Sequence, residues 1–181
     1  MQGGKTIQLH DRTFEPYLSE ETILKAIDKM AQKINQDYHD KSPLIIPVLN
    51  GAFMVAADLL KRINVKCEIS FTKLSSYSGT STTGTVKTLI GLGDDIEGRD
   101  IILLEDIVDT GITLEKLEEE VEKFKPKSVK VATLLVKPDA YHFRIPLAYV
   151  GLEIPNKFIV GYGLDYDGLG RNLRDIYVVT N

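Results

Sequence analysis

Three acidic residues and two threonines lie close together in the segment IILLEDIVDTGITL, residues 101–114. Glu105 and Asp106 follow an apolar run that is typical of a buried strand, and Asp109 comes three residues later. The next four residues, Thr-Gly-Ile-Thr at 110–113, stand where a helix is predicted to begin. Backbone N–H groups at a helix start, threonine hydroxyls and a glycine that permits close backbone approach together suit a phosphate group.

Adjacent carboxylates beside a phosphate would repel it unless a cation lies between them. Mg²⁺ meets this need, because it takes oxygen ligands, keeps several waters and bridges carboxylates to phosphate or sugar oxygens. The residue types at 105–113 therefore indicate Mg²⁺-dependent handling of a phosphorylated small molecule. The simpler alternative is a solvated loop in which Thr113 only caps the following helix.

Strands and helices alternate along the chain, and this alternation places the acidic segment at the edge of a sheet. Apolar residues at three- and four-residue steps predict a first helix to about residue 36, formed around Ile23, Ile27, Met30 and Ile34. Strands are predicted at 43–49, 65–72, 99–105 and 128–136, and further helices after Asn50-Gly51 and over 114–124. This order predicts an α/β fold with a mostly parallel twisted sheet flanked by helices. Ligands of such sheets bind beyond the carboxyl ends of the strands.

The composition is typical of one ordinary globular domain. The chain has 181 residues, of which 43% are hydrophobic and 27% charged, so we expect a single domain over 1–181. A net charge of −4 gives no sign of a nucleic-acid or membrane surface. No apolar stretch reaches the ~18 residues of a membrane span and the N-terminus lacks a secretory apolar region, so the expected location is the cytoplasm. The one cysteine, Cys67, excludes an internal disulfide and is expected to be structural.

Two stretches of the sequence resemble a known family. LLEDIVDTGITL, at 103–114, resembles the phosphoribosyl pyrophosphate motif of the type I phosphoribosyltransferases. VKPD at 136–139 and VGLEIPNKFIVGYGLDY at 150–166, followed by Arg171-Asn172-Leu173, are similar to the purine-binding half of hypoxanthine-guanine phosphoribosyltransferases. The resemblance runs from about residue 40 to the C-terminus. It implies the fold of that family, in which a small hood region covers the sheet edge.

The resemblance implies that phosphoribosyl pyrophosphate binds at the acidic edge. Glu105 and Asp106 would meet the ribose hydroxyls, directly or through Mg²⁺, while Arg171 would bind the pyrophosphate. Asp165 would hold a second Mg²⁺, so the implied metal ligands are Glu105, Asp106 and Asp165. The segment that would wrap the 5′-phosphate consists of Asp109, Thr110, Gly111, Ile112 and Thr113.

The resemblance also implies how a purine base would be recognised. Asp109 would face N7 of the base and act as the catalytic proton acceptor, which requires hydrogen-bond reach to that N–H. Lys137 would donate to the oxygen at C6 and so select 6-oxopurines over adenine. Phe158 would stack on the base, and Ile159 and the Asp165 region would meet its edge. Each residue also has a simpler interpretation: Phe158 as strand core, Lys137 as a solvated strand end, Asp165 as a turn acid and Arg171 as a surface charge.

The turn after the first predicted strand, VLNGAF at 48–53, matches the same subfamily in position but departs from it at one residue. Several relatives carry a lysine where this chain has Asn50, and the peptide bond before that lysine is cis. Asn50 cannot supply the charge, so Asn50 and Gly51 would contact the pyrophosphate through backbone N–H groups or the amide. Whether Leu49-Asn50 is cis stays open at this point.

A segment rich in serine, threonine and glycine, about 74–86, is interpreted as a flexible lid. Its only aromatic residue follows Ser76, and the pair Ser76-Tyr77 matches the subfamily in position. Such a composition cannot hold a core, which favours mobility beside a site that must exclude water. The alternative is a surface hairpin tip without a role.

The function that these observations favour is purine salvage: transfer of the phosphoribosyl group from phosphoribosyl pyrophosphate to hypoxanthine or guanine. The alternative is a nucleotide-binding regulator on the same fold, either an RNA attenuator or a non-catalytic sensor. The resemblance implies a homo-oligomer, a dimer or a tetramer. Side-chain identity does not rank hypoxanthine, guanine and xanthine, since all three carry the oxygen that Lys137 would read.

Overall fold

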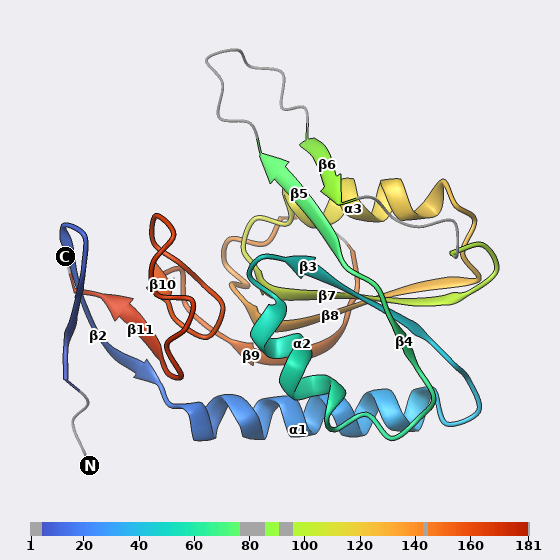
Figure 1. The fold of residues 1–181 in the computed structure, drawn as a ribbon, viewed down its shortest axis with the longest axis horizontal. Helices are drawn as coiled ribbons and strands as arrows, with labels where there is room; N and C mark the ends of the chain where they lie inside the picture. The colour runs from blue at the N-terminus through green and yellow to red at the C-terminus, as the bar shows by residue number, and fades with distance from the viewer. Residues whose placement is uncertain (1–4, 77–85, 91–95, 143–144, 181) are drawn as a thin grey trace.

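The computed structural model describes residues 5–76, 86–90, 96–142 and 145–180, and the larger of the two sheets in this part has seven strands (Figure 1). They are β3 (Leu44–Leu49), β4 (Glu68–Ile69), β5 (Thr72–Ser76), β6 (Val86–Ile90), β7 (Asp100–Val108), β8 (Ser128–Val136) and β9 (Leu147–Glu153). Their order in space is β6-β5-β3-β7-β8-β9, with β4 also paired to β3. Every pairing is parallel except β5 with β6. The predicted mostly parallel sheet is confirmed.

Helices cover both faces of this sheet. The two helices α1 (Glu20–Asp37) and α2 (Phe53–Leu60) lie on one face and α3 (Ile112–Glu122) lies on the other (Figure 1). Neighbouring residues of a strand point to opposite faces, so Ile102 and Leu104 pack with α1 and α2 while Ile101 and Leu103 pack with α3. Strands buried on both faces explain why the runs at 43–49 and 101–104 are apolar without alternation.

The first predicted helix is confirmed and its start has a clear cause. The hydroxyl of Ser19 accepts a hydrogen bond from the backbone N–H of Thr22 at 3.3 Å, and two glutamates follow in the first turn. The predicted apolar stripe of Ile23, Ile27, Met30 and Ile34 is buried. None of the helices in the described residues is both long and apolar enough to cross a membrane.

The second sheet forms the hood region at one end of the molecule (Figure 1). Its strands are β1 (Ile7–Leu9), β2 (Arg12–Leu18), β10 (Ile159–Val160) and β11 (Ile176–Val179). All pairs are antiparallel, in the order β1-β2-β11-β10. The hood therefore joins the N-terminal hairpin to the C-terminal segment that carries the predicted base-contacting residues Phe158 and Ile159.

Two predicted strand boundaries are wrong. The strand predicted to end at 105 continues to Val108, because β8 keeps pairing with it through Ile107↔Leu135 and Val108↔Val136. Glu105 and Asp106 thus lie inside a strand and not beyond it. The single strand predicted at 65–72 is instead two short strands, β4 and β5, since each pairs with a different part of β3. Cys67 lies just before β4 as a half-buried free thiol.

One prediction concerns a charged contact at the last turn of α1. Hydrogen bonds from Lys130 and Tyr149 lower the pKa of Asp37. A lowered pKa in the folded state stabilises the fold above the unfolded-state pKa of about 3.9, and this contribution disappears as the pH falls through the folded value. We expect Asp37→Asn to lower the free energy of unfolding at pH 7 by up to about 1 kcal/mol, with the gap shrinking below about pH 4. Urea unfolding of the wild type and the variant at pH 7 and below about pH 4 measures this difference in free energy of unfolding. An equal difference at the two pH values would refute the prediction.

Candidate active site

The carboxyl-terminal half of β7 carries two acidic side chains into the protein. Glu105 and Asp106 lie in the strand, and Glu105 is buried. Burial raises the pKa of Glu105 well above its usual range, and the neighbouring charge of Asp106 raises it further. Burial also raises the pKa of Asp106 to about 6, although the N–H of Ile107 and the charge of Arg171 act in the opposite direction. A bound cation or hydroxyl donors would stabilise the ionised form of these two adjacent carboxylates, which burial disfavours.

The Asp106 carboxylate lies directly against the turn that follows β3. A Cβ atom added to Gly51 would fall 1.7 Å from Oδ2 of Asp106, so only glycine leaves room for that carboxylate. The preceding Leu49-Asn50 peptide bond is cis, and the N–H of Ala52 donates to the carbonyl of Val48 at 3.1 Å. This turn therefore lies against Asp106 with its backbone at Gly51, and it has Asn50 at the position where several relatives carry a lysine.

A third segment, from the C-terminal part of the chain, contacts the turn at Gly51 through Gly163. Gly163 has a positive φ of 99°, and a Cβ there would lie 2.1 Å from the carbonyl oxygen of Gly51. The carbonyl of Gly163 accepts a hydrogen bond from Nη1 of Arg171 at 2.7 Å, while Nη2 of Arg171 lies 2.6 Å from Oδ1 of Asp165. The structure thus brings Gly51, Asp106, Asp165 and Arg171 together through backbone contact of two glycines.

The segment predicted to bind a phosphate forms a concave turn between β7 and α3. Gly111 has a φ of 92° and stands at the N-terminal end of the helix, where its carbonyl accepts from the N–H of Glu115 at 2.9 Å. A cavity of about 100 Å³ opens here, and its lining includes Glu105, Asp109, Thr110, Gly111 and Thr113. The side chain of Ile112 is exposed and is not part of this lining, so this residue offers backbone only. The alternative of Thr113 as a side-chain cap is not what the structure shows, since no side chain caps α3.

An ion pair links the predicted proton acceptor to the predicted selector of the base. Nζ of Lys137 lies 2.6 Å from Oδ2 of Asp109. The Lys137 side chain is only 8% exposed, whereas that of Asp109 is 46% exposed. The backbone N–H of Lys137 donates to the carbonyl of Val108 at 3.0 Å, which fixes the lysine beside the end of β7. Lys137 is therefore not a solvated strand end, because its buried side chain pairs with the partly exposed carboxylate of Asp109.

Phe158 and Ile159 belong to the hood. Ile159 is buried in β10, where it pairs with Val178 of β11. Phe158 precedes that strand and is 41% exposed, so it is not a core residue. Its ring lies edge-on to Tyr166 with centroids 5.7 Å apart, and the guanidinium of Arg12 lies 5.5 Å from its centroid. Within the described residues, no hydrogen bond or ion pair joins Phe158 to the Asp109–Lys137 pair.

Several residues of this region were not predicted from the sequence. Arg12 and Tyr166 surround Phe158, and the guanidinium of Arg12 also lies 5.1 Å from the Tyr166 ring centroid. Gly163 was missed as well, although the pattern Gly-Tyr-Gly at 161–163 was a signal for an unusual turn. Of the predicted lid, Ser76 is the last residue of β5, while Tyr77 and residues to 85 lie outside the described part.

The carboxylate oxygens of Glu105 and Asp106 fit Mg²⁺, which binds through one or two carboxylates and completes its shell with water and substrate oxygens. The part of the chain that the structure describes contains no group of three or more histidine, cysteine, aspartate or glutamate side chains placed to hold a metal. The resemblance assigns Asp165 to a second Mg²⁺, separate from Glu105 and Asp106, and in the structure its carboxylate is paired with Arg171.

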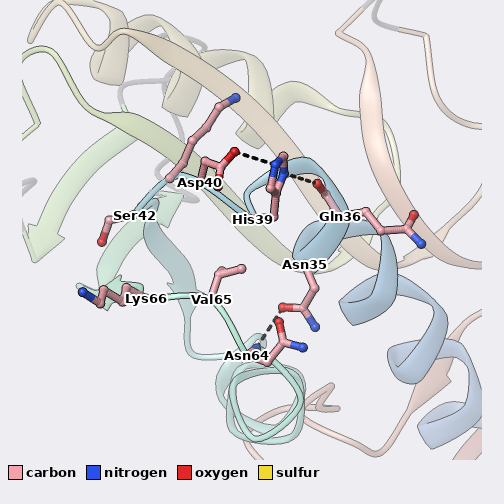
Figure 2. A pocket seen from close by; sticks show the side chains of 9 residues that line it. Asn35, Gln36, His39, Asp40, Ser42, Asn64, Val65 and Lys66 are labelled. Carbon is pink, nitrogen blue, oxygen red and sulfur yellow. Dashed lines mark hydrogen bonds and ion pairs between the residues drawn. The ribbon is translucent and has the colours of Figure 1, made fainter.

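A larger open groove lies away from this edge, around the C-terminal end of α1 (Figure 2). All but one of its side chains are polar, and two of them bond to nearby backbone: Oδ1 of Asn35 accepts from the N–H of Asn64 at 2.9 Å, and the ring of His39 bonds to the carbonyl of Gln36 at 3.1 Å. Such a groove is typical of a hydrated surface. Its size alone does not connect it to the chemistry of the strand ends.

We expect Gly51→Ala to test the contact between the β3 turn and β7. The added methyl group cannot coexist with the present position of Asp106, so the turn or the carboxylate must move. The expected result is a loss of about 1–3 kcal/mol in the free energy of unfolding together with weaker binding of phosphoribosyl pyrophosphate. Gly151→Ala is the control, because its Cβ meets the carbonyl of Leu134 at 2.6 Å inside the sheet. If both variants lose stability and bind this ligand like the wild type, Gly51 has no role in the site.

Comparison with known proteins identifies the family. The family model described as phosphoribosyl transferase domain matches residues 15–167. A hypoxanthine-guanine phosphoribosyltransferase of Mycobacterium tuberculosis is 42% identical over 96% of this chain and 90% of its own length. The enzyme of the same name from Streptococcus pyogenes is 45% identical over 89% of this chain and 90% of its own. A solved structure of a Bacillus anthracis hypoxanthine-guanine phosphoribosyltransferase superimposes with a TM-score of 0.86 at 39% identity, covering 91% of this chain and 98% of that one. The chain belongs to the phosphoribosyl transferase domain family.

Proposed function

We propose that this protein is a purine salvage enzyme that transfers the 5-phosphoribosyl group from phosphoribosyl pyrophosphate to a 6-oxopurine, giving IMP or GMP and pyrophosphate. The observation that carries the proposal is the Asp109–Lys137 ion pair, which lies beside the turn predicted to bind the phosphate, at the carboxyl edge of the sheet. A carboxylate and an ammonium 2.6 Å apart match the N–H at N7 and the oxygen at C6 of a 6-oxopurine, which lie next to each other on its edge. The relatives named above support the same activity.

The sugar phosphate is proposed to lie across the strand ends. The backbone N–H groups of residues 110–113 would bind the 5′-phosphate at the start of α3. Glu105 and Asp106 would accept hydrogen bonds from the ribose hydroxyls, and the Arg171 guanidinium would bind the pyrophosphate. Asn50 and Gly51 would add backbone contacts to the same group, because the turn faces Asp106 with its main chain.

The reaction is proposed to proceed by substitution at C1′ of the ribose. N9 of the purine forms a bond to C1′ while the bond from C1′ to the pyrophosphate oxygen breaks, and the proton at N7 passes to Asp109. Lys137 holds the base by donating to the oxygen at C6. Arg171 stabilises the charge that develops on the leaving pyrophosphate. When bound, Mg²⁺ supplies further neutralisation of this leaving group, with Glu105 and Asp106 as the residues that would hold it.

Phe158 is proposed to stack on the base, and the backbone of Ile159 with the region of Asp165 to meet its edge. The exposure of the Phe158 ring supports this role, since an aromatic face must be free to receive a base. The cytoplasm is the proposed location. A homo-oligomer, dimer or tetramer, is the proposed assembly, and light scattering should give a mass near twice or four times 20.2 kDa.

The activity is tested by offering five bases separately with phosphoribosyl pyrophosphate, once with Mg²⁺ and once with excess chelator. We expect nucleotide from hypoxanthine and guanine with Mg²⁺, a much slower reaction with adenine, none with uracil, and none from any base with the chelator. Xanthine is included to rank the 6-oxopurines. Nucleotide from adenine or uracil at a rate equal to that with hypoxanthine would overturn the assignment of the base.

A further inference from the structure

The short loop that brings Gly163 to Gly51 has an unusual backbone. Gly161, Tyr162 and Gly163 all have positive φ values, of 106°, 50° and 99°. A tyrosine with positive φ is uncommon, because its Cβ is strained there. The N–H of Tyr162 donates to the carbonyl of Leu173 at 2.9 Å, and that of Gly163 to the carbonyl of Arg171 at 2.9 Å. This conformation turns the Tyr162 side chain away from the loop and into the protein.

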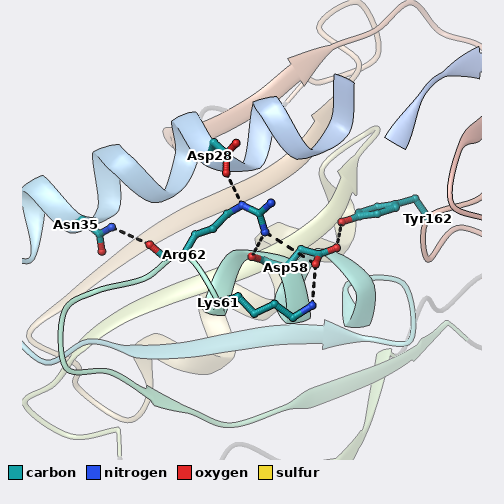
Figure 3. A network of polar contacts seen from close by, with 6 residues as sticks. All are labelled: Asp28, Asn35, Asp58, Lys61, Arg62 and Tyr162. Atoms are coloured by element: carbon teal, nitrogen blue, oxygen red, sulfur yellow. Dashed lines mark hydrogen bonds and ion pairs between the residues drawn. The ribbon is translucent and has the colours of Figure 1, made fainter. Parts of the chain in front are cut away.

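The hydroxyl of Tyr162 belongs to a polar network that joins α2 to α1 (Figure 3). Tyr162 is 1% exposed, and its hydroxyl donates to Oδ2 of Asp58 at 2.5 Å. The other carboxylate oxygen of Asp58 lies 3.0 Å from Nζ of Lys61, and Arg62 links the carbonyl of Asp58 to the Asp28 carboxylate on α1. Burial acts to raise the pKa of Asp58, but the hydrogen bonds from Tyr162 and Lys61 keep that pKa below its ordinary value.

The network and the site form one closed ring of contacts. Gly51 leads directly into α2, which carries Asp58. Asp58 holds Tyr162, the residue before Gly163, and the backbone of Gly163 returns to the carbonyl of Gly51. The links of this ring are covalent chain segments, the hydrogen bond from Tyr162 to Asp58, and a backbone approach at Gly163 too close to leave room for a Cβ. A shift of Tyr162 must therefore move Gly163 relative to Gly51.

We infer that Tyr162 and Asp58 are positioning residues for the pyrophosphate side of the site. Their hydrogen bond holds Gly163 against Gly51, and Gly163 in turn fixes Arg171, whose guanidinium donates to its carbonyl. The inference rests on the proposed function, because Arg171 and Gly51 are there assigned to the pyrophosphate. Neither Tyr162 nor Asp58 is placed to touch the substrate, and both act through the loop.

The chain offers a matched control for this bond. Tyr149 is also buried, at 2% exposure, and its hydroxyl donates to Oδ2 of Asp37 at 2.6 Å. A lysine, Lys130, accompanies that pair at the last turn of α1, just as Lys61 accompanies Asp58. Tyr162→Phe and Tyr149→Phe therefore each remove a buried tyrosine's hydroxyl from a part-buried bond to an aspartate, and only the first bond adjoins Gly163.

The experiment compares wild type, Tyr162→Phe, Asp58→Ala, the double variant and Tyr149→Phe. We expect Tyr162→Phe to raise KM for phosphoribosyl pyrophosphate roughly tenfold, below the roughly hundredfold loss that a 1 Å misplacement can produce. KM for the purine base should change little. The double variant should be no worse than Asp58→Ala alone, because both substitutions remove one shared bond. Tyr149→Phe should lose a similar amount of thermal stability and keep the wild-type KM values.

Binding of phosphoribosyl pyrophosphate with Mg²⁺, measured by calorimetry on the same proteins, separates this inference from the proposed function. If the wild type turns over 6-oxopurines and Tyr162→Phe behaves like Tyr149→Phe, the positioning role is wrong while the enzyme assignment stands. If the wild type binds the ligand without any turnover and Tyr162→Phe binds it more weakly, the enzyme assignment fails and the positioning role is supported. Equal binding by all five proteins overturns the positioning role in either case.

Discussion

Asp109→Asn is expected to lower kcat for hypoxanthine and guanine by about 100- to 10,000-fold, the range for loss of a general base. The amide has the size of the carboxylate and can still accept a hydrogen bond from Lys137, but it cannot take the proton from N7. Phosphoribosyl pyrophosphate should bind to the variant nearly as it does to the wild type, because the backbone N–H groups of 110–113 are unchanged. Steady-state kinetics and calorimetry of the same preparation measure the two quantities.

Asp40→Asn is the control for this substitution. Asp40 is an exposed carboxylate that pairs with His39 in the loop after α1, and no role in the reaction is assigned to it. It should keep the wild-type kcat. A fall of less than tenfold for Asp109→Asn would show that another group takes the proton.

Lys137→Met is expected to lower kcat/KM for 6-oxopurines by roughly 100-fold, which corresponds to losing a hydrogen bond of about 3 kcal/mol from a charged donor. The apolar chain keeps much of the volume of the buried lysine stem but leaves the oxygen at C6 without a donor. The variant also leaves Asp109 without its ion-pair partner. Adenine has an amino group at C6, so its much slower reaction should not fall in parallel, and the preference for 6-oxopurines should shrink.

Lys127→Met serves as the matched variant for Lys137→Met. Lys127 pairs loosely with Asp100 at 3.6 Å near the opposite ends of the strands, and its side chain is well exposed. We expect it to retain the wild-type preference among bases. A Lys137→Met variant that keeps the wild-type ratio of hypoxanthine to adenine would show that the base is selected elsewhere.

The central sheet could be predicted because its signals are local. An apolar run such as 43–49 or 101–104 and the helix stripe of α1 each fit one element, and their alternation determines a parallel sheet. The hood could not be predicted in this way. Its strands β1, β10 and β11 have two to four residues, too short for periodicity to register, and they form only because β2 pairs with β11 from the other end of the chain.

The site shows the same division. The segment 105–113 carries its chemistry in consecutive residues, so its types and spacing indicated carboxylates beside a phosphate turn. The contacts of Gly51 with Asp106 and Gly163 depend on backbone conformation and on residues up to 112 positions apart, which no local pattern records. Family resemblance supplied Lys137, because a lysine at the end of an apolar strand is chemically unremarkable until the fold places it 2.6 Å from Asp109.

Asp109 and Lys137 are the central residues of the proposed base site, and a crystal structure with bound hypoxanthine tests this directly. We expect Nζ of Lys137 to lie within about 3.2 Å of the oxygen at C6, and the N–H at N7 to donate to a carboxylate oxygen of Asp109 within about 3.2 Å, the reach of a hydrogen bond. Lys137 and Asp109 should then each bond to the base, in place of the bond that they make to each other without it. A complex in which Asp109 and Lys137 remain paired and the base lies elsewhere would contradict the account.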